Sequence, residues 1–320
     1  MEVLHTPVLL EETIAYLAPR GEGELMVDAT LGEGGHSEAF LERFPGLAVI
    51  GIDADPFIQE KAKKRLERFG SRIRFFSGWS EDFFNGFSGG VSNGFAGARP
   101  NTVLFDLGIS MYHYEESGRG FSFRKDEYLD MRIDSESGKT AAELVAALSE
   151  KDFADLLWNN AGERYSRRIA RSVAEAKRRG DVTTTGTLAE CVRAAVPAAY
   201  RRGPVHPATK TFQALRIAVN GDLERLPRLL EKALDALEEN GRVGVISFHS
   251  AEDRIVKFFF RGRSRDCTCP PSEPICRCGG PAITVLTRKA VSAGREELRR
   301  NPPSRSARLR VAEKLRKEEA

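Results

Sequence analysis

The sequence predicts an α/β fold with a mostly parallel sheet, interrupted by an all-helical insertion. In the first third of the chain, short apolar runs alternate with helical patterns, which is typical of a parallel sheet with helices on both faces. From about residue 113 to 205 only helical patterns follow an irregular, glycine-rich stretch. The alternation then resumes, so both ends of the chain are expected to build one sheet.

The N-terminal elements are predicted from apolar periodicity and capping residues. Residues 7–17 have the spacing of an amphipathic helix, with Thr6 as a possible N-cap. Asp55-Pro56 is a good N-cap and first-turn pair for a helix that Gly70 closes, while residues 85–100 are expected to form a loop. A further helix is expected at 38–44, and strands at 25–27, 47–53, 72–76 and 102–106.

The remaining elements divide the chain into three segments. Residues 1–112 are expected to form the first part of the core, 113–205 the helical insertion, and 206–320 the second part. Within the insertion, helices are expected at 140–148, 151–159, 163–179 and 187–200. In the last segment we expect helices at 207–220 and 223–239, and strands at 242–248, 283–286 and 307–311.

Composition indicates a globular protein of the cytoplasm. The 320 residues are 41% hydrophobic and 30% charged. No apolar run approaches the roughly 20 residues that span a bilayer, and residues 1–5 do not resemble a signal peptide.

The distribution of charge favours a polyanionic partner. Net charge is only +3, but residues 161–216 hold 12 Lys and Arg against 4 Asp and Glu, and residues 286–320 hold 11 against 5. Two basic regions on an otherwise acidic chain suggest nucleic acid. Solvated helix faces are the simpler alternative.

The stretch Asp28–Ser37 has the features of a cofactor loop. It holds three glycines and lies between a predicted strand and a predicted helix. Glycines let a backbone approach a ligand closely, and a helix N-terminus offers unpaired N–H groups. A nucleotide cofactor would suit this loop.

Further polar side chains follow the other predicted strands. Asp53, Trp79, Asp106 and His249 each come at or just after a carboxyl end, which is where ligands bind in open α/β sheets. Asp53 is placed to accept hydrogen bonds from ribose hydroxyls, and Trp79 could stack on an adenine. Dinucleotides and S-adenosylmethionine both fit this pattern of residues. The fingerprint of a dinucleotide-binding loop, however, has a third glycine at the position where this chain has Ser37.

Motifs along nearly the whole chain resemble the bacterial 16S ribosomal RNA cytosine N4-methyltransferase family. Besides Asp28–Ser37, the matching motifs occur in the same order as in the family. They lie at residues 5–10, 53–56, 106–108, 119–123, 129–132, 162–165, 206–209, 211–216, 246–250 and 304–307.

The resemblance implies a Rossmann-like class I methyltransferase core that binds S-adenosylmethionine and methylates the N4 amine of a cytosine in the decoding centre of the small ribosomal subunit. It carries cofactor contacts onto Gly34, Gly35, His36, Asp53, Trp79, Asp106 and His113. The chain departs from the family pattern at Ser110–His113, where Ser-Ser-x-Gln is usual, and at Ala251, where leucine is usual.

Two residues are candidates for the chemistry on the amine. Asp106 could accept one N–H of the cytosine amine as positive charge develops, although cofactor binding is a competing role. His249 is the second candidate, and a purely structural histidine is its alternative. Two other functions stay open from the residues alone: a nucleotide-cofactor oxidoreductase and a non-catalytic RNA-binding or ribosome-assembly factor.

RNA and metal contacts are also suggested. Arg164, Arg167, Arg168 and Arg171 are spaced along one predicted helix of the insertion, as a phosphate-binding face would be, or as a solvated basic face would be. Four cysteines, Cys267, Cys269, Cys276 and Cys278, lie within 12 residues. That number suits structural zinc, with plain reduced thiols as the alternative.

Overall fold

The computed structural model describes residues 6–88, 99–180, 182–266, 269 and 280–316. The chain divides into two compact units. The first, called the sheet unit, comprises residues 1–109 and 225–320, and the second, called the helical unit, comprises residues 110–224.

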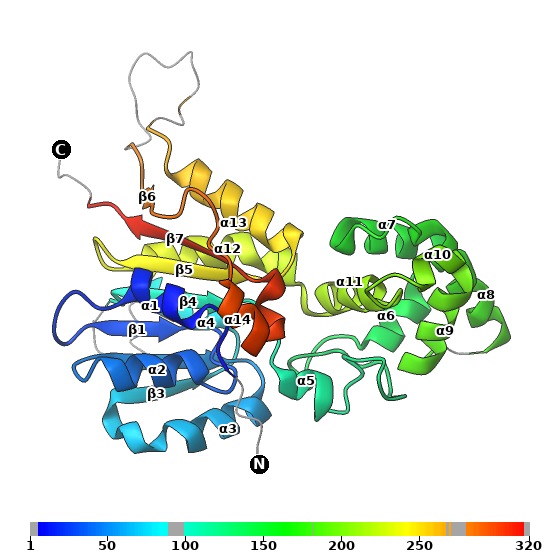
Figure 1. Cartoon of the computed structure of the whole chain (residues 1–320), viewed down its shortest axis with the longest axis horizontal. Helices are drawn as coiled ribbons and strands as arrows, with labels where there is room; N and C mark the ends of the chain where they lie inside the picture. Colours follow the sequence, from blue (N-terminus) through cyan, green and yellow to red (C-terminus); the bar gives the residue numbers. More distant parts are fainter. Residues whose placement is uncertain (1–5, 89–98, 181, 267–268, 270–279, 317–320) are drawn as a thin grey trace. The chain divides into compact units, whose positions relative to one another are not determined.

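The sheet unit contains one seven-stranded sheet in the order β3-β2-β1-β4-β5-β7-β6 (Figure 1). Strand β7 is antiparallel to both of its neighbours, and the other pairs are parallel. The sheet is built from both ends of the chain, so the predicted α/β fold is confirmed. The strands are β1 Leu25–Asp28, β2 Ala48–Asp53, β3 Ile73–Ser77, β4 Thr102–Asp106, β5 Arg242–Ser247, β6 Ile283–Val285 and β7 Arg308–Lys314.

Alternate residues of each strand enter two separate hydrophobic cores, one on each face of the sheet. Val27 and Val103 enter one core, whereas Met26 and Leu104 enter the other, because successive side chains of a strand point to opposite faces. The first core includes residues of α4 Ser80–Ser88, α12 Asp222–Ala236 and α13 Ser250–Arg263. The second includes residues of α1 Leu10–Leu17, α2 Gly35–Arg43 and α3 Pro56–Leu66.

The sequence prediction missed three helices of this unit. These are α4, α13 and the short α14 Arg295–Arg300. Helix α4 begins before the loop predicted at 85–100 and extends into it, and its Phe83 and Phe84 are buried against the sheet. Residues 89–98 of that predicted loop lie outside the described residues. Two 3₁₀ segments complete the unit, η1 Glu67–Arg72 and η2 Pro302–Ser306.

The predicted Thr6 cap is wrong, because a distant residue sets the start of α1. Leu9 precedes the helix in the left-handed region, with φ 54°. Its backbone N–H donates to Glu297 Oε1 at 2.7 Å, and Asn301 Nδ2 donates to the Thr6 carbonyl at 3.1 Å. Both partners lie almost 300 residues later in the chain, so local sequence could not reveal them.

In the helical unit, the described residues form helices and irregular segments but no strand longer than an isolated bridge between Tyr128 and Thr184. The predicted helix 187–200 is two helices, because Pro197 cannot continue the first. The helices are α5 Met111–Glu115, α6 Ala141–Ala147, α7 Glu150–Ala161, α8 Ser166–Arg179, α9 Thr185–Ala195, α10 Ala198–Arg201 and α11 Thr209–Asn220. No described helix of the chain is long and apolar enough to cross a membrane.

The end of the helical unit differs from the boundary expected at residue 205. Helix α11 packs against α7 and α6, and Asn160 Nδ2 donates to the Ala214 carbonyl at 3.1 Å. At its C-terminus, Asn220 Oδ1 accepts the Ile133 N–H at 2.8 Å and Asn220 Nδ2 donates to the Met131 carbonyl at 2.9 Å. These contacts place α11 with the helical unit, which extends to residue 224.

Candidate active site

Backbone hydrogen bonds fix the loop after β1 to the neighbouring strands. Gly32 N–H donates to Asp53 Oδ2 at 2.8 Å, and Leu31 N–H donates to the Ile52 carbonyl at 2.8 Å. On the other side, the Asp106 N–H donates to Thr30 Oγ1 at 2.6 Å. The loop therefore has a defined conformation at the carboxyl ends of β1, β2 and β4.

Gly34 and Gly35 start α2, and neither site has room for a side chain. Gly34 has φ 80°, and a Cβ there would lie 2.9 Å from Leu66 Cδ1. A Cβ on Gly35 would lie 2.7 Å from Pro7 Cγ. The absence of a side chain at both positions lets the loop pack closely against Leu66 and Pro7, with Gly34 buried and Gly35 partly exposed.

Ser37, which replaces the third glycine of a dinucleotide loop, has a partner of its own. Its hydroxyl donates to Asp28 Oδ2 at 2.7 Å, and Asp28 is only 2% exposed. Burial raises the pKa of Asp28 to about 6, although the Ser37 hydroxyl and the Thr30 backbone oppose the rise. The only sequence signal for this hydrogen bond was an acid and a serine nine residues apart at the two ends of the loop. The sequence analysis did not predict the Asp28–Ser37 pair.

Asp53 and Trp79 are brought together at the ends of β2 and β3. The Gly78 N–H donates to the Asp53 carbonyl at 2.9 Å. This hydrogen bond brings Trp79, the residue after Gly78, near the end of β2. One face of the Trp79 ring is covered by the Arg225 guanidinium, 3.9 Å from the ring centroid. Such a cation–π contact orients the indole, so only the opposite ring face is suited to stacking on a base.

Asp106 lies at the centre of a group of ionisable side chains. Its Oδ1 accepts the Gly108 N–H at 3.1 Å, and its Oδ2 lies 3.7 Å from His36 Nδ1. The other ring nitrogen of His36, Nε2, donates to the Val8 carbonyl at 3.1 Å. Burial raises the pKa of Asp106 to about 7, and the charges of Asp28 and Glu252 add to the rise.

His249 has a structural role in this arrangement. It caps α13, with Nδ1 accepting the Glu252 N–H at 3.4 Å and Nε2 lying 2.8 Å from Glu252 Oε1. Glu252 Oε2 in turn accepts the Phe248 N–H at 2.8 Å. Glu252 is buried and was missed by the sequence analysis, although its position three residues after His249 is that of a capping box.

The site is therefore rich in negative charge. Asp28, Asp53, Asp106 and Glu252 interact electrostatically. The pKa values of Asp28 and Asp106 are raised, mainly because burial disfavours the charged carboxylate and to a smaller extent because neighbouring acids repel it. A cation would relieve this repulsion, whereas the pyrophosphate of a dinucleotide would increase it. The chemistry of the site fits S-adenosylmethionine, whose sulfonium is positive.

The remaining predicted cofactor residue, His113, belongs to the helical unit. It is buried on α5, and its ring centroid lies 5.1 Å from that of Phe121. Its contact with a cofactor stays a prediction.

The four predicted RNA-binding arginines are exposed on the helical unit, but they do not all lie on one helix. Arg164 precedes α8, and its guanidinium lies 4.9 Å from the ring centroids of both Tyr165 and Tyr200. Arg167, Arg168 and Arg171 are on α8, and Arg171 Nε lies 3.7 Å from Glu150 Oε1. They form a basic surface with two aromatic rings.

Of the four clustered cysteines, Cys267, Cys276 and Cys278 lie outside the described residues. Cys269 lies within the described residues and is partly exposed. Among the residues that the structure does describe, no group of three His, Cys, Asp or Glu side chains is arranged to hold a metal ion.

The strand order and the site together define the class of protein. A seven-stranded sheet in which only β7 is antiparallel is the arrangement of class I methyltransferases, whereas the all-parallel dinucleotide-binding fold has strand order 3-2-1-4-5-6. The model of the MraW methylase family matches residues 2–315. The chain belongs to the MraW methylase family, and it is a methyltransferase.

Several relatives share nearly the whole chain. The protein named "Ribosomal RNA small subunit methyltransferase H" from Treponema denticola is 56% identical over 98% of this chain and 98% of its own length. Proteins of the same name from Treponema pallidum and Heliobacterium mobile are each 42% identical, covering 97% and 98% of this chain and 92% and 100% of their own lengths. These relatives support neither an oxidoreductase nor a non-catalytic factor.

The raised pKa of Asp106 predicts a pH-dependent gain in stability for Asp106→Asn. The unfolded carboxyl has its ordinary pKa of 3.8 and the folded one a pKa of about 7. The folded state therefore binds the proton more tightly, and the cost of ionising Asp106 is present in full above pH 7 and absent below pH 4. We expect the variant to be more stable than wild type by about 1–3 kcal/mol at pH 8, with the difference closing towards pH 4.5.

Urea unfolding of both proteins without cofactor at the two pH values measures this difference. The asparagine Oδ1 still accepts the Gly108 N–H, so the comparison isolates the charge. A variant that is equally destabilised at both pH values would show that Asp106 is not held at an electrostatic cost.

Proposed function

We propose that this protein uses S-adenosylmethionine to methylate the exocyclic N4 amine of a cytosine in the decoding centre of 16S rRNA. The observation that supports this most directly is the acidic site around Asp106, at the carboxyl ends of the strands, where the cofactor loop lies. The names of the relatives supply the substrate class, ribosomal RNA of the small subunit.

Six residues of the sheet unit would hold the cofactor. Gly34 and Gly35 would admit it against the backbone, Asp53 would accept its ribose hydroxyls, and Trp79 would stack on its adenine with the ring face opposite Arg225. His36 and Asp106 would lie near the positive charge. His113 from the helical unit would complete the set, as the resemblance implies.

Once bound, S-adenosylmethionine supplies a methyl group on a sulfonium, which is a strong electrophile. The protein must place the amine in line behind the methyl group and accept a proton as the N–C bond forms. Asp106 suits this second task, because a carboxyl group with a pKa of about 7 is about half ionised at neutral pH and is a stronger base than an ordinary carboxylate. Its hydrogen bond from Gly108 fixes the orientation of the carboxylate.

His249 is the weaker catalytic candidate. Its Nδ1 accepts the backbone hydrogen bond that caps α13, and its Nε2 lies 2.8 Å from Glu252 Oε1. We assign it to holding the end of β5 rather than to proton transfer.

Incubation with labelled S-adenosylmethionine and unmodified small ribosomal subunits tests the reaction. We expect label on N4 of a single cytosine of 16S rRNA. Asp106→Asn should lower the transfer rate by at least about 10²-fold, because an amide is a far weaker proton acceptor. It should leave RNA binding within about twofold. Near-normal turnover by the variant would remove Asp106 from the mechanism.

We also propose that the basic surface of Arg164, Arg167, Arg168 and Arg171 binds rRNA phosphates, which would make the helical unit an RNA-recognition domain. Reversing the charge of Arg167, Arg168 and Arg171 to glutamate should weaken binding to small subunits by more than about tenfold at moderate salt. Cofactor affinity, measured calorimetrically, should not change. Unaltered RNA binding would contradict this assignment.

The substrate implies a cytoplasmic protein that meets rRNA in the small ribosomal subunit. For the cysteine cluster at residues 267–278 we propose structural zinc, supported by four thiols at short spacing. Metal analysis of protein purified without a histidine tag should find one zinc per chain. A metal-free chain with four titratable thiols would favour reduced cysteines instead.

A further inference from the structure

On helix α13 the acidic side chains face the protein, and most of the basic side chains face solvent. Its acids face inward, with Glu252 buried beside His249 and Asp253 Oδ1 2.7 Å from Arg310 Nε. Three of its four bases, Arg254, Lys257 and Arg261, are exposed, and the fourth, Arg263 in the last turn, pairs with Glu231. Within the described part of the chain none of these three bases makes an ion pair. The outer face of α13 is therefore a stripe of uncompensated positive charge, outside the two basic regions seen in the sequence.

An exposed phenylalanine lies within this stripe. Phe258 is 57% exposed, and it follows Arg254 by four residues and precedes Arg261 by three, so the three side chains share one face of the helix. Exposing a large aromatic side chain forgoes the free energy of burying it. An aromatic ring among unpaired cations is the combination with which proteins bind single-stranded nucleic acid, by stacking on a base between phosphate contacts.

The stripe is rigidly connected to the candidate active site. Helix α13 starts directly after His249 at the carboxyl end of β5, and its inner residues Val256 and Phe260 are buried in the core. Arg254 therefore lies one turn from the site, and Arg261 about 10 Å further along the helix. A nucleic acid strand that follows the stripe would lead to the site.

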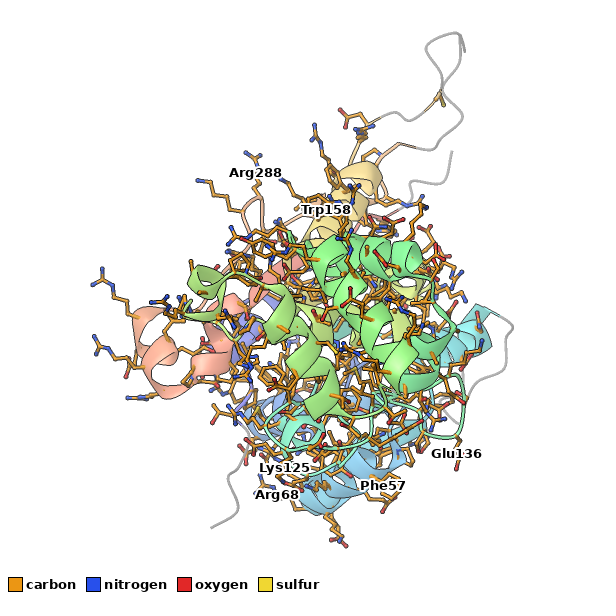
Figure 2. All side chains as sticks on the ribbon, turned by 90° about the vertical axis from the view of Figure 1, so that its right-hand side faces the viewer. Phe57, Arg68, Lys125, Glu136, Trp158 and Arg288 are labelled. Carbon is orange, nitrogen blue, oxygen red and sulfur yellow. The ribbon has the colours of Figure 1, made fainter. Side chains whose placement is uncertain are left out.

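Helix α3 offers a useful contrast. It exposes Phe57 even more, at 62% (Figure 2), but its charges are of both signs and several of them are paired. Lys63 Nζ lies 2.6 Å from Glu60 Oε1, and just after the helix Arg68 pairs with Glu38 and Glu42. Exposure of a phenylalanine alone does not distinguish α13. The uncompensated cations around it do.

We propose that the outer face of α13, formed by Arg254, Lys257, Phe258 and Arg261, binds a single-stranded segment of the RNA substrate. The three cations contact phosphates, and Phe258 stacks on a base. The inference rests on the proposed function for the identity of the RNA. It adds to the sheet unit a contact surface that is separate from the arginines of the helical unit.

Two variants test the two kinds of contact. Changing Arg254, Lys257 and Arg261 together to glutamine should weaken binding to unmodified small subunits by about 10–100-fold near 0.1 M salt. It should also make the slope of log affinity against log salt shallower by about 2, since each single-strand phosphate contact contributes about 0.7. Phe258→Ala should weaken binding by about 5–100-fold without changing that slope.

Matched controls separate these effects from general changes in charge or folding. Arg20, Arg43 and Lys63 are bases of the sheet unit that each have an ion-pair partner. Changing these three to glutamine, and separately Phe57→Ala, should leave affinity within about twofold. All variants should bind S-adenosylmethionine like wild type.

The outcomes separate this inference from the proposed function. If wild type methylates the subunits and the α13 variants bind with unchanged affinity and salt slope, the α13 surface is wrong. An effect seen with whole subunits but not with protein-free 16S rRNA would assign the face to a ribosomal protein and overturn RNA as its partner. If wild type binds the RNA without methylating it, the proposed function is wrong. The RNA affinities of the α13 variants still test the α13 surface in that case.

Discussion

The cost of holding acids in poorly solvated positions at the carboxyl ends of the strands, with repulsion among them as a smaller contribution, is the constraint on which the site depends. Asp28 and Asp106 are held where burial raises the pKa of each to about 6 and about 7. The fold tolerates this because fixed donors meet the carboxylates: Ser37 on Asp28, Gly32 on Asp53 and Gly108 on Asp106. The free-energy cost of ionising these carboxylates in the empty site is relieved when a cation binds. The same acids that destabilise the folded protein without cofactor therefore favour binding of a positively charged cofactor.

The glycines are explained by the same geometry. A side chain on Gly108 would lie 2.7 Å from Phe248 Cε2 and 3.1 Å from Asp106 Oδ1, so this glycine lets its N–H approach the carboxylate. Phe248 is held by the Glu252 carboxylate, which also anchors His249. The candidate proton acceptor and the start of α13 are thus parts of one packed assembly, and a change in either should affect both.

Recognition of RNA is proposed on two surfaces that combine cations with aromatic rings. On the helical unit, Arg164 contacts Tyr165 and Tyr200, and burial together with the Glu163 carboxylate raises the pKa of Tyr200 to about 12. On α13, Phe258 stands among bases without partners. Aromatic stacking supplements charge with contacts that salt does not screen, which would suit the proposed methylation of a cytosine that has left its stack.

The sequence by itself determined the sheet, the cofactor loop and the acids at the strand ends, because short apolar runs and glycine turns are local signals. It also determined the family, through motifs spread over nearly the whole chain. It could not determine features that depend on distant partners, such as Glu297 setting the start of α1 or α11 joining the helical unit. The inward acids and outward bases of α13 became visible only in the tertiary structure, because only packing decides which face of a helix meets the core.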